Sequence, residues 1–148
     1  MGTAENKSIV QRYFDAVNAG DMDTITALLH DDVVFWVPPS LPDGVEFCGK
    51  AMVLQLFTQS VGLYDADAGL TVRMQSLTAE DDRVAAELEI RGKAANGGGD
   101  YENWYHFLFR VSDGKIVQIR EHLDTLYAYR TLFIPAGITE RAHCKWLP

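Results

Sequence analysis

The chain has 148 residues, of which 47% are hydrophobic, and this fits one globular domain over residues 1–148 with a single core. Its formal net charge of −8 argues against nucleic acid and anionic membranes as partners, because both bind basic surfaces. The sequence has no apolar run long enough to cross a bilayer and no signal-peptide pattern, so we expect a cytoplasmic protein.

The first half of the chain predicts helices around one short strand. Apolar residues recur at helical spacing up to Gly20, a residue suited to end a helix, and Asp21 is suited to cap the next one. The expected elements are helices at 4–19 and 22–29, a strand at 33–37, a loop at 38–44 and a helix at about 50–62. The loop is required because three prolines and a glycine are incompatible with regular structure there.

The second half changes to the alternating pattern of half-buried strands. The expected elements are strands at 70–78, 83–91, 101–111 and 115–123, followed by a short helix from Asp124 to about Leu132. Helices followed by a meander of strands indicate an α+β fold. We expect a curved antiparallel sheet that wraps three N-terminal helices into a cone with an internal cavity, as in a cystatin-like α+β barrel.

Two stretches resemble known proteins. VQRYFDAVNAGDMDTITALLHDDVVF closely resembles the opening of bacterial ketosteroid isomerases, and YENWYHFLFRVSDGKIVQIREHLDT resembles the ending of SnoaL-like polyketide cyclases. Both groups belong to the nuclear transport factor 2-like superfamily, and the resemblance spans about residues 5 to 137. It implies the cone fold, and it leaves the reaction open because this fold hosts many chemistries and also binding modules.

The resemblance to ketosteroid isomerases carries over only one of their three functional groups. Tyr13 matches the tyrosine that hydrogen-bonds the substrate oxyanion. The position of the aspartate base is Val37, which cannot take a proton. The protonated aspartic acid matches His106, or Phe107 if the turn is one residue shorter. We therefore do not expect isomerisation of ketosteroids by the mechanism of that family.

The resemblance to the cyclases supplies another base. Their acidic base lies on the last strand, three residues before a final aspartate. If Asp124 is that aspartate, the base is Glu121. The partner histidine of the cyclases matches Ile119, so that part of their site is missing.

Strand geometry tests Glu121 independently. A turn at 112–114 with a glycine bulge pairs Phe107 with Ile119 and Tyr105 with Glu121, which places Glu121 on the apolar face that lines the core. Desolvation there would raise its pKa and make it a usable base or acid. A register error of one residue exchanges the faces; the residues then placed inside are His106, Arg120 and His122. The other face carries two aromatic or aliphatic residues among charged ones, and the resemblance implies a homodimer through this outer face, because proteins of this superfamily commonly dimerise there.

We expect Glu121 and Tyr13 to be catalytic, the first by moving a proton next to a carbonyl and the second by stabilising the oxyanion. The expected substrate-binding residues are Asn103, Tyr105, Trp36, Val37, Phe57 and Asp124. Asp124 is also suited to cap the helix that follows it.

The function predicted from these residues is a cofactor-free isomerase, cyclase or dehydratase with an apolar small-molecule substrate. One alternative is a non-catalytic ligand-binding or dimerisation module, with a dry apolar cavity and Glu121 outside. Another is a limonene-type epoxide hydrolase, whose Asp-Arg-Asp set could draw only on Asp124 and Arg120. The histidines, His143 among them, lack metal-ligand spacing, so no metal is expected. Cys48 and Cys144 are expected to be reduced thiols.

Overall fold

The computed structural model describes residues 2–139, and the predictions for His143 and Cys144 lie outside this range. Its elements are α1 (Thr3–Ala19), α2 (Met22–Leu28), β1 (Leu29–Trp36), β2 (Glu46–Cys48), α3 (Lys50–Val61), β3 (Leu70–Glu80), β4 (Arg83–Lys93), β5 (Asp100–Ser112), β6 (Lys115–Leu123), α4 (Thr125–Ala128) and the π-helix η1 (Tyr129–Phe133). Most boundaries lie close to the predicted ones. Strand β1 begins four residues earlier than predicted, because the exposed polar residues 30–32 conceal its first part. The short strand β2 was not predicted.

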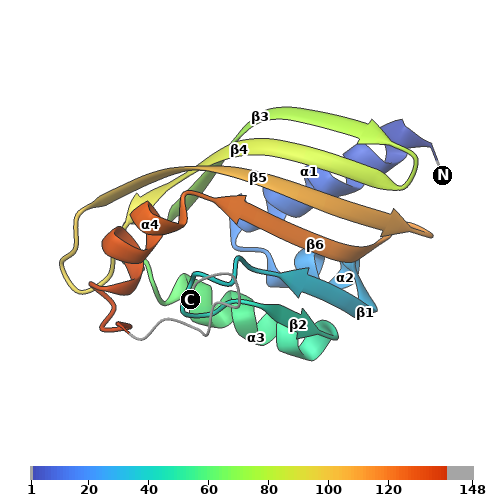
Figure 1. The fold of residues 1–148 in the computed structure, drawn as a ribbon. Helices are drawn as coiled ribbons and strands as arrows, with labels where there is room; N and C mark the ends of the chain where they lie inside the picture. The colour runs from blue at the N-terminus through green and yellow to red at the C-terminus, as the bar shows by residue number, and fades with distance from the viewer. Residues whose placement is uncertain (1, 140–148) are drawn as a thin grey trace.

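The strands form one curved, open sheet in the order β2-β1-β6-β5-β4-β3 (Figure 1). The α+β class and the curved sheet are as predicted. One detail differs from the expected antiparallel sheet, since β1 and β6 run parallel. This pairing brings the first strand of the chain beside the last one, so residues from both ends of the sequence meet in the middle of the sheet.

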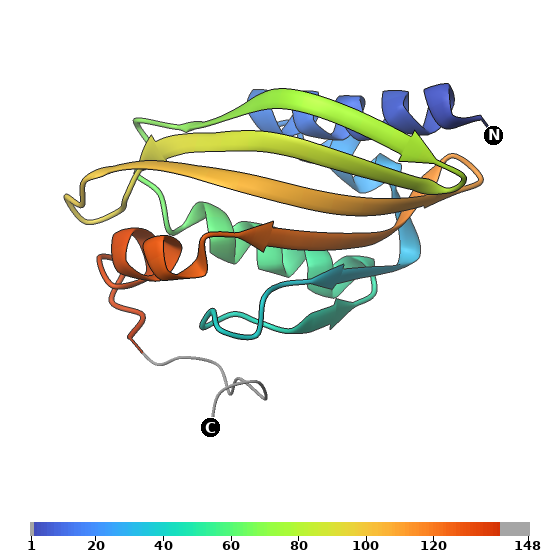
Figure 2. The ribbon, with the colours of Figure 1, turned by 45° about the horizontal axis from the view of Figure 1, so that its top comes forward.

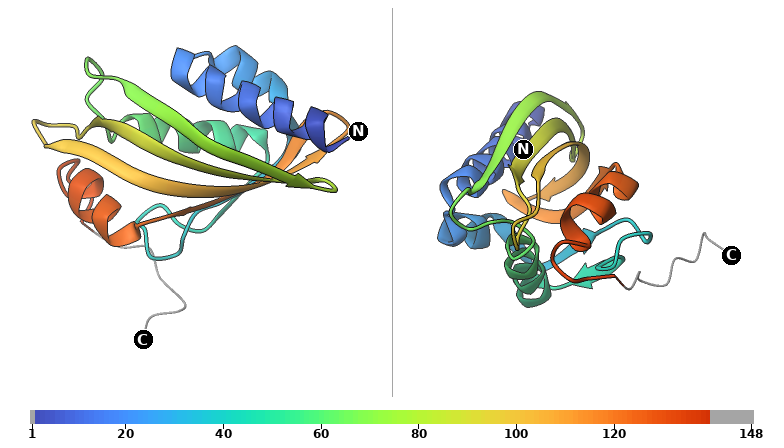
Figure 3. Two further views of the ribbon diagram at one scale, coloured as in Figure 1. Left: turned by 90° about the horizontal axis from the view of Figure 1, so that it is seen from above. Right: turned by 90° about the vertical axis from the view of Figure 1, so that its left-hand side faces the viewer.

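The three N-terminal helices cover one face of the sheet, while α4 lies at one end of the strands (Figures 2 and 3). Two asparagines of α1 fasten that helix to the sheet edge. The Asn18 side chain accepts a hydrogen bond from Val72 N at 2.6 Å and donates one to Val72 O at 2.9 Å. Near the other end of α1, Asn6 Nδ2 donates to Asp81 O at 3.1 Å. The helix therefore has a fixed position over the sheet, and so do the side chains that it directs toward β5 and β6.

Alternation along β5 separates an inner face, toward the helices, from an outer face. The inner residues are all buried and are Tyr101, Asn103, Tyr105, Phe107, Phe109 and Val111. The outer residues are the exposed Glu102, Trp104, His106 and Arg110 and the half-buried Leu108. The core of the molecule lies between the inner face and α1, α2 and α3.

The predicted register of the last hairpin was wrong by two residues. Ser112 pairs with Lys115 across a two-residue turn, in which both central residues have positive φ, typical of a type I′ turn. The ladder then skips Val117, which is an extra residue on β6. Turn and bulge each displace the pairing by one residue, so Glu121 lies opposite Phe107. A displacement of two preserves the faces, and Glu121 is on the inner face as expected.

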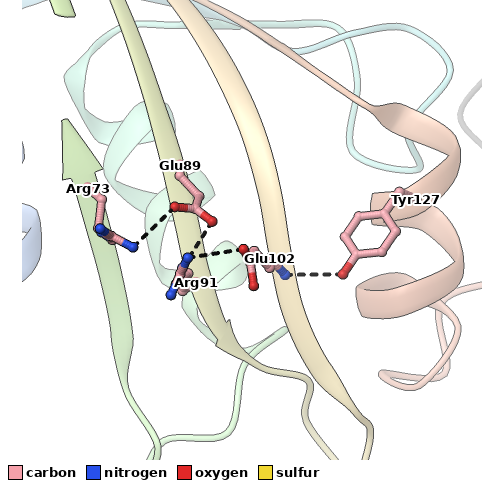
Figure 4. Close-up of polar contacts among 5 residues, drawn as sticks. All are labelled: Arg73, Glu89, Arg91, Glu102 and Tyr127. Carbon is pink, nitrogen blue, oxygen red and sulfur yellow. Dashed lines mark hydrogen bonds and ion pairs between the residues drawn. The ribbon is translucent and has the colours of Figure 1, made fainter. Parts of the chain in front are cut away.

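A cluster of ion pairs covers part of the outer face (Figure 4). Glu89 of β4 is only 2% exposed and contacts Arg73 at 3.7 Å and Arg91 at 3.0 Å. Arg91 also pairs with Glu102 at 3.1 Å, and the backbone N–H of Glu102 donates to the Tyr127 hydroxyl at 3.1 Å. This last bond fastens α4 to the end of β5 that extends beyond β6.

Within residues 2–139, no helix is long and apolar enough to span a membrane. The same range contains no group of three or more acidic, histidine or cysteine residues that could hold a metal ion. Cys48 is exposed and forms no disulfide within the described residues.

Candidate functional site

Glu121 lies on β6 and directs its carboxyl group to the inner face of the sheet, on the side of the helices. Its side chain is half-buried, and within residues 2–139 it has no hydrogen bond or ion pair. Burial, and secondarily the charge of Asp43, raises the pKa of Glu121 from 4.5 to about 8. A carboxyl group with this pKa changes protonation state near neutral pH, which is what an acid or base catalyst requires.

Four tyrosines respond to the charge of Glu121. They come from separate parts of the chain, namely Tyr13 on α1, Tyr64 after α3, and Tyr101 and Tyr105 on β5. Burial is the largest cause of a raised pKa in each of the four, and the negative charge of Glu121 adds to it. The phenols therefore remain neutral at physiological pH and can act as hydrogen-bond donors.

A buried hydrogen-bond chain orders two of these tyrosines. Asn103 Nδ2 donates to the Tyr101 hydroxyl at 2.9 Å and to Asp124 O at 3.1 Å. The hydroxyls of Tyr101 and Tyr105 are 2.5 Å apart. Because Asn103 donates to the Tyr101 hydroxyl, Tyr101 can donate a hydrogen bond to Tyr105, whose own O–H can then be directed to the Tyr64 hydroxyl or to a ligand. Asn103 and Tyr105, both predicted to line the site, are thus parts of one chain.

Aromatic packing holds Tyr13 in place. Its ring lies against Phe109 at 5.5 Å and against Phe57 at 6.3 Å between ring centroids, and Phe57 in turn packs on Phe35 at 5.6 Å. Val37 is buried and comes one residue after Trp36, as Glu121 comes one residue after Arg120. Because Trp36 pairs with Arg120, the side chains of Val37 and Glu121 point to the same, inner side of the sheet. Three predicted residues, Tyr13, Phe57 and Val37, therefore lie on the side of the sheet that holds Glu121.

An opening in the surface lies next to this group. It is a depression of about 440 Å³ lined by Pro42, Asp43, Gln59, Gly62, Leu63, Phe133, Ala136 and Ile138. Asp43 belongs both to this lining and to the surroundings of Glu121, whose pKa it raises. Tyr64 directly follows the lining residue Leu63. The depression thus lies near Glu121 through Asp43, while Glu121 and the four tyrosines are not among the residues that line it.

Trp36 lies on the opposite side of the sheet from Glu121, and not beside it as predicted. Trp36 pairs with Arg120 on the outer face, where the guanidinium carbon lies 4.9 Å from its ring centroid and the His122 ring lies 5.1 Å away. His106, also on the outer face, pairs with His122. The alternative set of Arg120, His106 and His122 is thus grouped together, on the opposite side of the sheet from Glu121. Strand alternation requires this, because Trp36 is one residue removed from the inward-facing Val37.

Asp124 does not point into the site with Glu121. Its carboxylate accepts a hydrogen bond from the backbone N–H of Tyr127 at 3.0 Å and caps α4, while the residue is exposed. Only its carbonyl oxygen takes part in the inner network, through Asn103. With Arg120 on the outer face, residues 2–139 do not bring Asp124 and Arg120 together as an Asp-Arg-Asp site would require.

Sequence reasoning missed Asp43, Tyr64 and Tyr101. Tyr101 could have been found, because it lies on the same predicted strand face as Asn103 and Tyr105. Asp43 and Tyr64 lie in irregular segments, where periodicity carries no information about direction. The proline-rich loop offered only a weak signal, a single carboxylate among apolar residues.

The comparisons agree with this architecture. A family model of the SnoaL-like domain matches residues 10–119, which is most of the chain. The chain belongs to the SnoaL-like domain family. This family is part of the nuclear transport factor 2-like superfamily, as the sequence predicted. No protein of curated function matches the sequence significantly.

Solved structures share the fold of this SnoaL-like protein. A Xanthomonas campestris protein of unknown function with a cystatin-like fold is 25% identical, with a TM-score of 0.76 over 86% of this chain and 97% of the other. A candidate SnoaL-like polyketide cyclase from Jannaschia sp. CCS1 is 16% identical, with a TM-score of 0.74 over 88% and 92%. An LEH-like epoxide hydrolase from M. tuberculosis is 21% identical, with a TM-score of 0.69 over 91% and 94%. Identities of 16% and 21% show a common fold and leave the reaction open.

Proposed function

We propose that this SnoaL-like protein is a cofactor-free enzyme that moves a proton next to a carbonyl group of an apolar small molecule. Glu121 is the acid or base, and the hydroxyls of Tyr105 and Tyr13 stabilise the negative charge that develops on the carbonyl oxygen. Isomerisation, ring closure and loss of water all begin with such a step.

One observation carries the proposal. Within residues 2–139 Glu121 has no hydrogen-bond or ion-pair partner, its pKa is about 8, and it lies near tyrosine hydroxyls and near Asp43, which lines a surface depression. Leaving a carboxyl group enclosed and unpaired costs folding free energy, so a structural role does not account for it. At pH 7 most molecules hold Glu121 protonated, and the ionised form, which acts as the base, increases toward pH 8 and above.

The two alternatives have less support. A non-catalytic binding module was expected to have a purely apolar cavity with Glu121 outside, whereas Glu121 is on the inner face together with polar hydroxyls. An epoxide hydrolase of the limonene type needs an Asp-Arg-Asp set, and Asp124 and Arg120 lie apart.

The proposal can be tested without knowing the natural substrate. Apolar cyclic ketones are incubated with the protein in D₂O, and replacement of their α-protons by deuterium is followed by NMR. The wild-type protein is expected to accelerate exchange, with a rate that rises with pH up to about 8. Glu121→Gln is expected to lower the rate by about 100-fold or more. The matched control is Glu46→Gln, which removes an exposed carboxylate from β2. Exchange at the wild-type rate in Glu121→Gln would refute the role of Glu121.

We also infer that the outer face of the sheet forms a homodimer. The side chain of Trp104 on this face is 56% exposed. A second depression, of about 290 Å³, lies beside it and is lined by Glu87, Trp104, Tyr105, His106, His122 and Leu123. An exposed tryptophan beside a concave surface is typical of a contact between proteins.

A further inference from the structure

The larger surface depression is built from three segments that are far apart in the sequence. Its lining residues fall within 42–43 in the loop between β1 and β2, 59–63 around the end of α3, and 133–138 at the end of η1 and beyond. Its volume of about 440 Å³ lies in the range of pockets that hold small molecules. Because Glu121 and the four tyrosines are not part of this lining, binding here can be measured separately from proton transfer at Glu121.

The walls of the depression have a defined shape. In the loop, Gly44 N donates to Leu41 O at 3.1 Å and closes a turn around Asp43. In the last segment, Ile138 N donates to Phe133 O at 2.9 Å. The remaining wall is the end of a helix, whose backbone is held by its own hydrogen bonds. The depression is therefore formed before any ligand binds, as is usual for small-molecule sites.

The lining is apolar apart from two side chains. Leu63 and Phe133 are among its apolar residues, and Asp43 and Gln59 are its polar ones within residues 2–139. Gln59 carries a neutral amide, which can both donate and accept. A mostly apolar pocket with a few polar groups is typical of a site that takes an apolar molecule and orients it by one polar end.

Asp43 is the acidic group of this lining, and it lacks a cation. Its Oδ1 atom is buried and has no hydrogen-bond partner within residues 2–139, and no lysine, arginine or histidine of that range contributes to its pKa. Burial raises the pKa of Asp43, and the bond from its own backbone N–H only partly offsets this. An ionised carboxyl group in this state costs folding free energy, and a positively charged ligand would lower that cost.

We propose that the depression binds a small molecule with an apolar body and a protonated amine, whose N–H groups donate to the Asp43 carboxylate. An ammonium group supplies both the hydrogen-bond donor and the positive charge that Asp43 lacks, and such a bond is stronger than one from a neutral hydroxyl. The carboxyl plane of an aspartate turns easily about its last torsion, so either oxygen can be directed to the ligand. The apolar lining contacts the body of the molecule.

The charge of the whole protein favours the same class of ligand. Its formal net charge of −8 attracts cations and repels carboxylates and phosphates. Within residues 2–139 no basic side chain lines the depression, so an anionic head group has no partner there. Selectivity thus combines attraction of the ammonium group with repulsion of anions.

Three compounds with the same phenethyl body test the site, namely phenethylamine, phenethyl alcohol and hydrocinnamate. Each is added to the wild-type protein at pH 7, and the backbone amide resonances are followed by NMR. Phenethylamine is expected to shift resonances of the three lining segments and to bind about tenfold or more tightly than the alcohol. Hydrocinnamate is expected to cause no saturable shift.

Two variants and a control assign the binding. Asp43→Asn keeps the shape of the side chain and removes its charge, so phenethylamine should bind about tenfold or more weakly, close to the alcohol. Glu46→Gln is the matched control, because it removes one negative charge from an exposed side chain of β2 and should bind like the wild type. Ala136→Leu fills the depression from the last segment and should abolish binding, which keeps a test available if Asp43→Asn does not fold.

The outcomes separate this proposal from the proposed function, on which it does not depend. Equal affinity for the amine and the alcohol, or unchanged amine binding in Asp43→Asn, would overturn the proposal. So would amine-induced shifts that lie outside the three segments or persist in Ala136→Leu. Specific amine binding by a protein that never exchanges ketone α-protons would support this site and refute the enzyme, and exchange without amine binding would do the reverse.

Discussion

Tyr101 and Tyr105 lie four residues apart on β5, and their hydroxyls meet at 2.5 Å. Both are buried, and Asn103 between them donates to the Tyr101 hydroxyl. Every second residue of a strand points to the same side, so the three side chains lie in one row on the inner face. The row leads from the backbone of Asp124, at the beginning of α4, toward Glu121.

Replacing either tyrosine by phenylalanine should separate stability from function. In Tyr101→Phe, Asn103 and Tyr105 each lose a partner, so we expect the free energy of unfolding to fall by about 1–3 kcal/mol. In Tyr105→Phe the hydroxyls of Tyr101 and Tyr64 each lose a partner, and the hydroxyl proposed to bind the carbonyl oxygen is removed. We expect a similar loss of stability in this variant and slower α-proton exchange than in Tyr101→Phe. Urea denaturation and the exchange assay measure the two effects, and faster exchange in Tyr105→Phe than in Tyr101→Phe would contradict the proposed role of Tyr105.

The sequence allowed the fold to be predicted because its patterns are local. Helical spacing up to Gly20, the proline-rich loop and the alternation along β5 each specify an element without knowledge of the rest. The parallel pairing of β1 with β6 was not predicted. It joins residues more than eighty positions apart, and no local pattern records which strands become neighbours.

The face of Glu121 was predicted correctly although its partner was not. A type I′ turn alone would have placed Glu121 outside, because it displaces the register by one residue. The bulge at Val117 restores the inner face. Bulges leave little trace in sequence, so counting from the turn gave the wrong partner for Glu121, and it gave the correct face because the turn and the bulge together displace the register by an even number of residues.

Asp43 shows the limit of sequence reasoning for the site. Its importance depends on the direction of one side chain in an irregular loop and on the proximity of that loop to β6. Residue propensities predict neither the direction of that side chain nor the position of the loop relative to β6. The same holds for Trp36, whose large apolar ring suggested a cavity wall, although cation–π packing under Arg120 serves the outer face equally well.

Trp104→Glu tests the proposed homodimer. If two outer faces pack together, a buried charge in the contact should convert a dimer to a monomer, because an unpaired carboxylate cannot be desolvated without cost. Sedimentation velocity should show half the mass, with an unchanged circular dichroism spectrum. Val61→Glu is the matched control, since Val61 is 60% exposed on α3, away from the outer face. A wild-type protein that is monomeric, or a Trp104→Glu variant that remains dimeric, would refute this interface.

Glu89 should stabilise the protein mainly above acidic pH. Hydrogen bonding, first with Glu102 and then with Arg91, lowers the pKa of Glu89 below its usual value of 4.5. A lowered pKa gives stability that is present above 4.5 and is lost as the pH falls through the value in the folded protein. Glu89→Gln should therefore lower the free energy of unfolding at pH 7 and have little effect near pH 3.

Urea denaturation at the two pH values measures this difference. Glu87→Gln, on the same face of β4 and exposed, provides the control. An equal loss of stability at both pH values would show that Glu89 acts through packing rather than through its charge.

Glu121 should have the opposite dependence on pH. Its pKa rises from 4.5 to about 8 in the folded protein, so the folded state binds its proton more tightly than the unfolded state. The wild-type protein is then most stable below pH 4.5 with respect to this group, and loses that stability as the pH rises to about 8.

Glu121→Gln removes the group that loses its proton. We expect this variant to equal the wild type near pH 4.5 and to exceed it by a few kcal/mol at pH 9, since each unit of pKa corresponds to about 1.4 kcal/mol. Some dependence should persist in the variant, because burial also raises the pKa of Asp43. Urea denaturation across this range, with Glu46→Gln following the wild type, measures the effect. Parallel curves for Glu121→Gln and the wild type would mean that Glu121 ionises as freely in the folded protein as in water, and would remove the basis for its role as an acid or base.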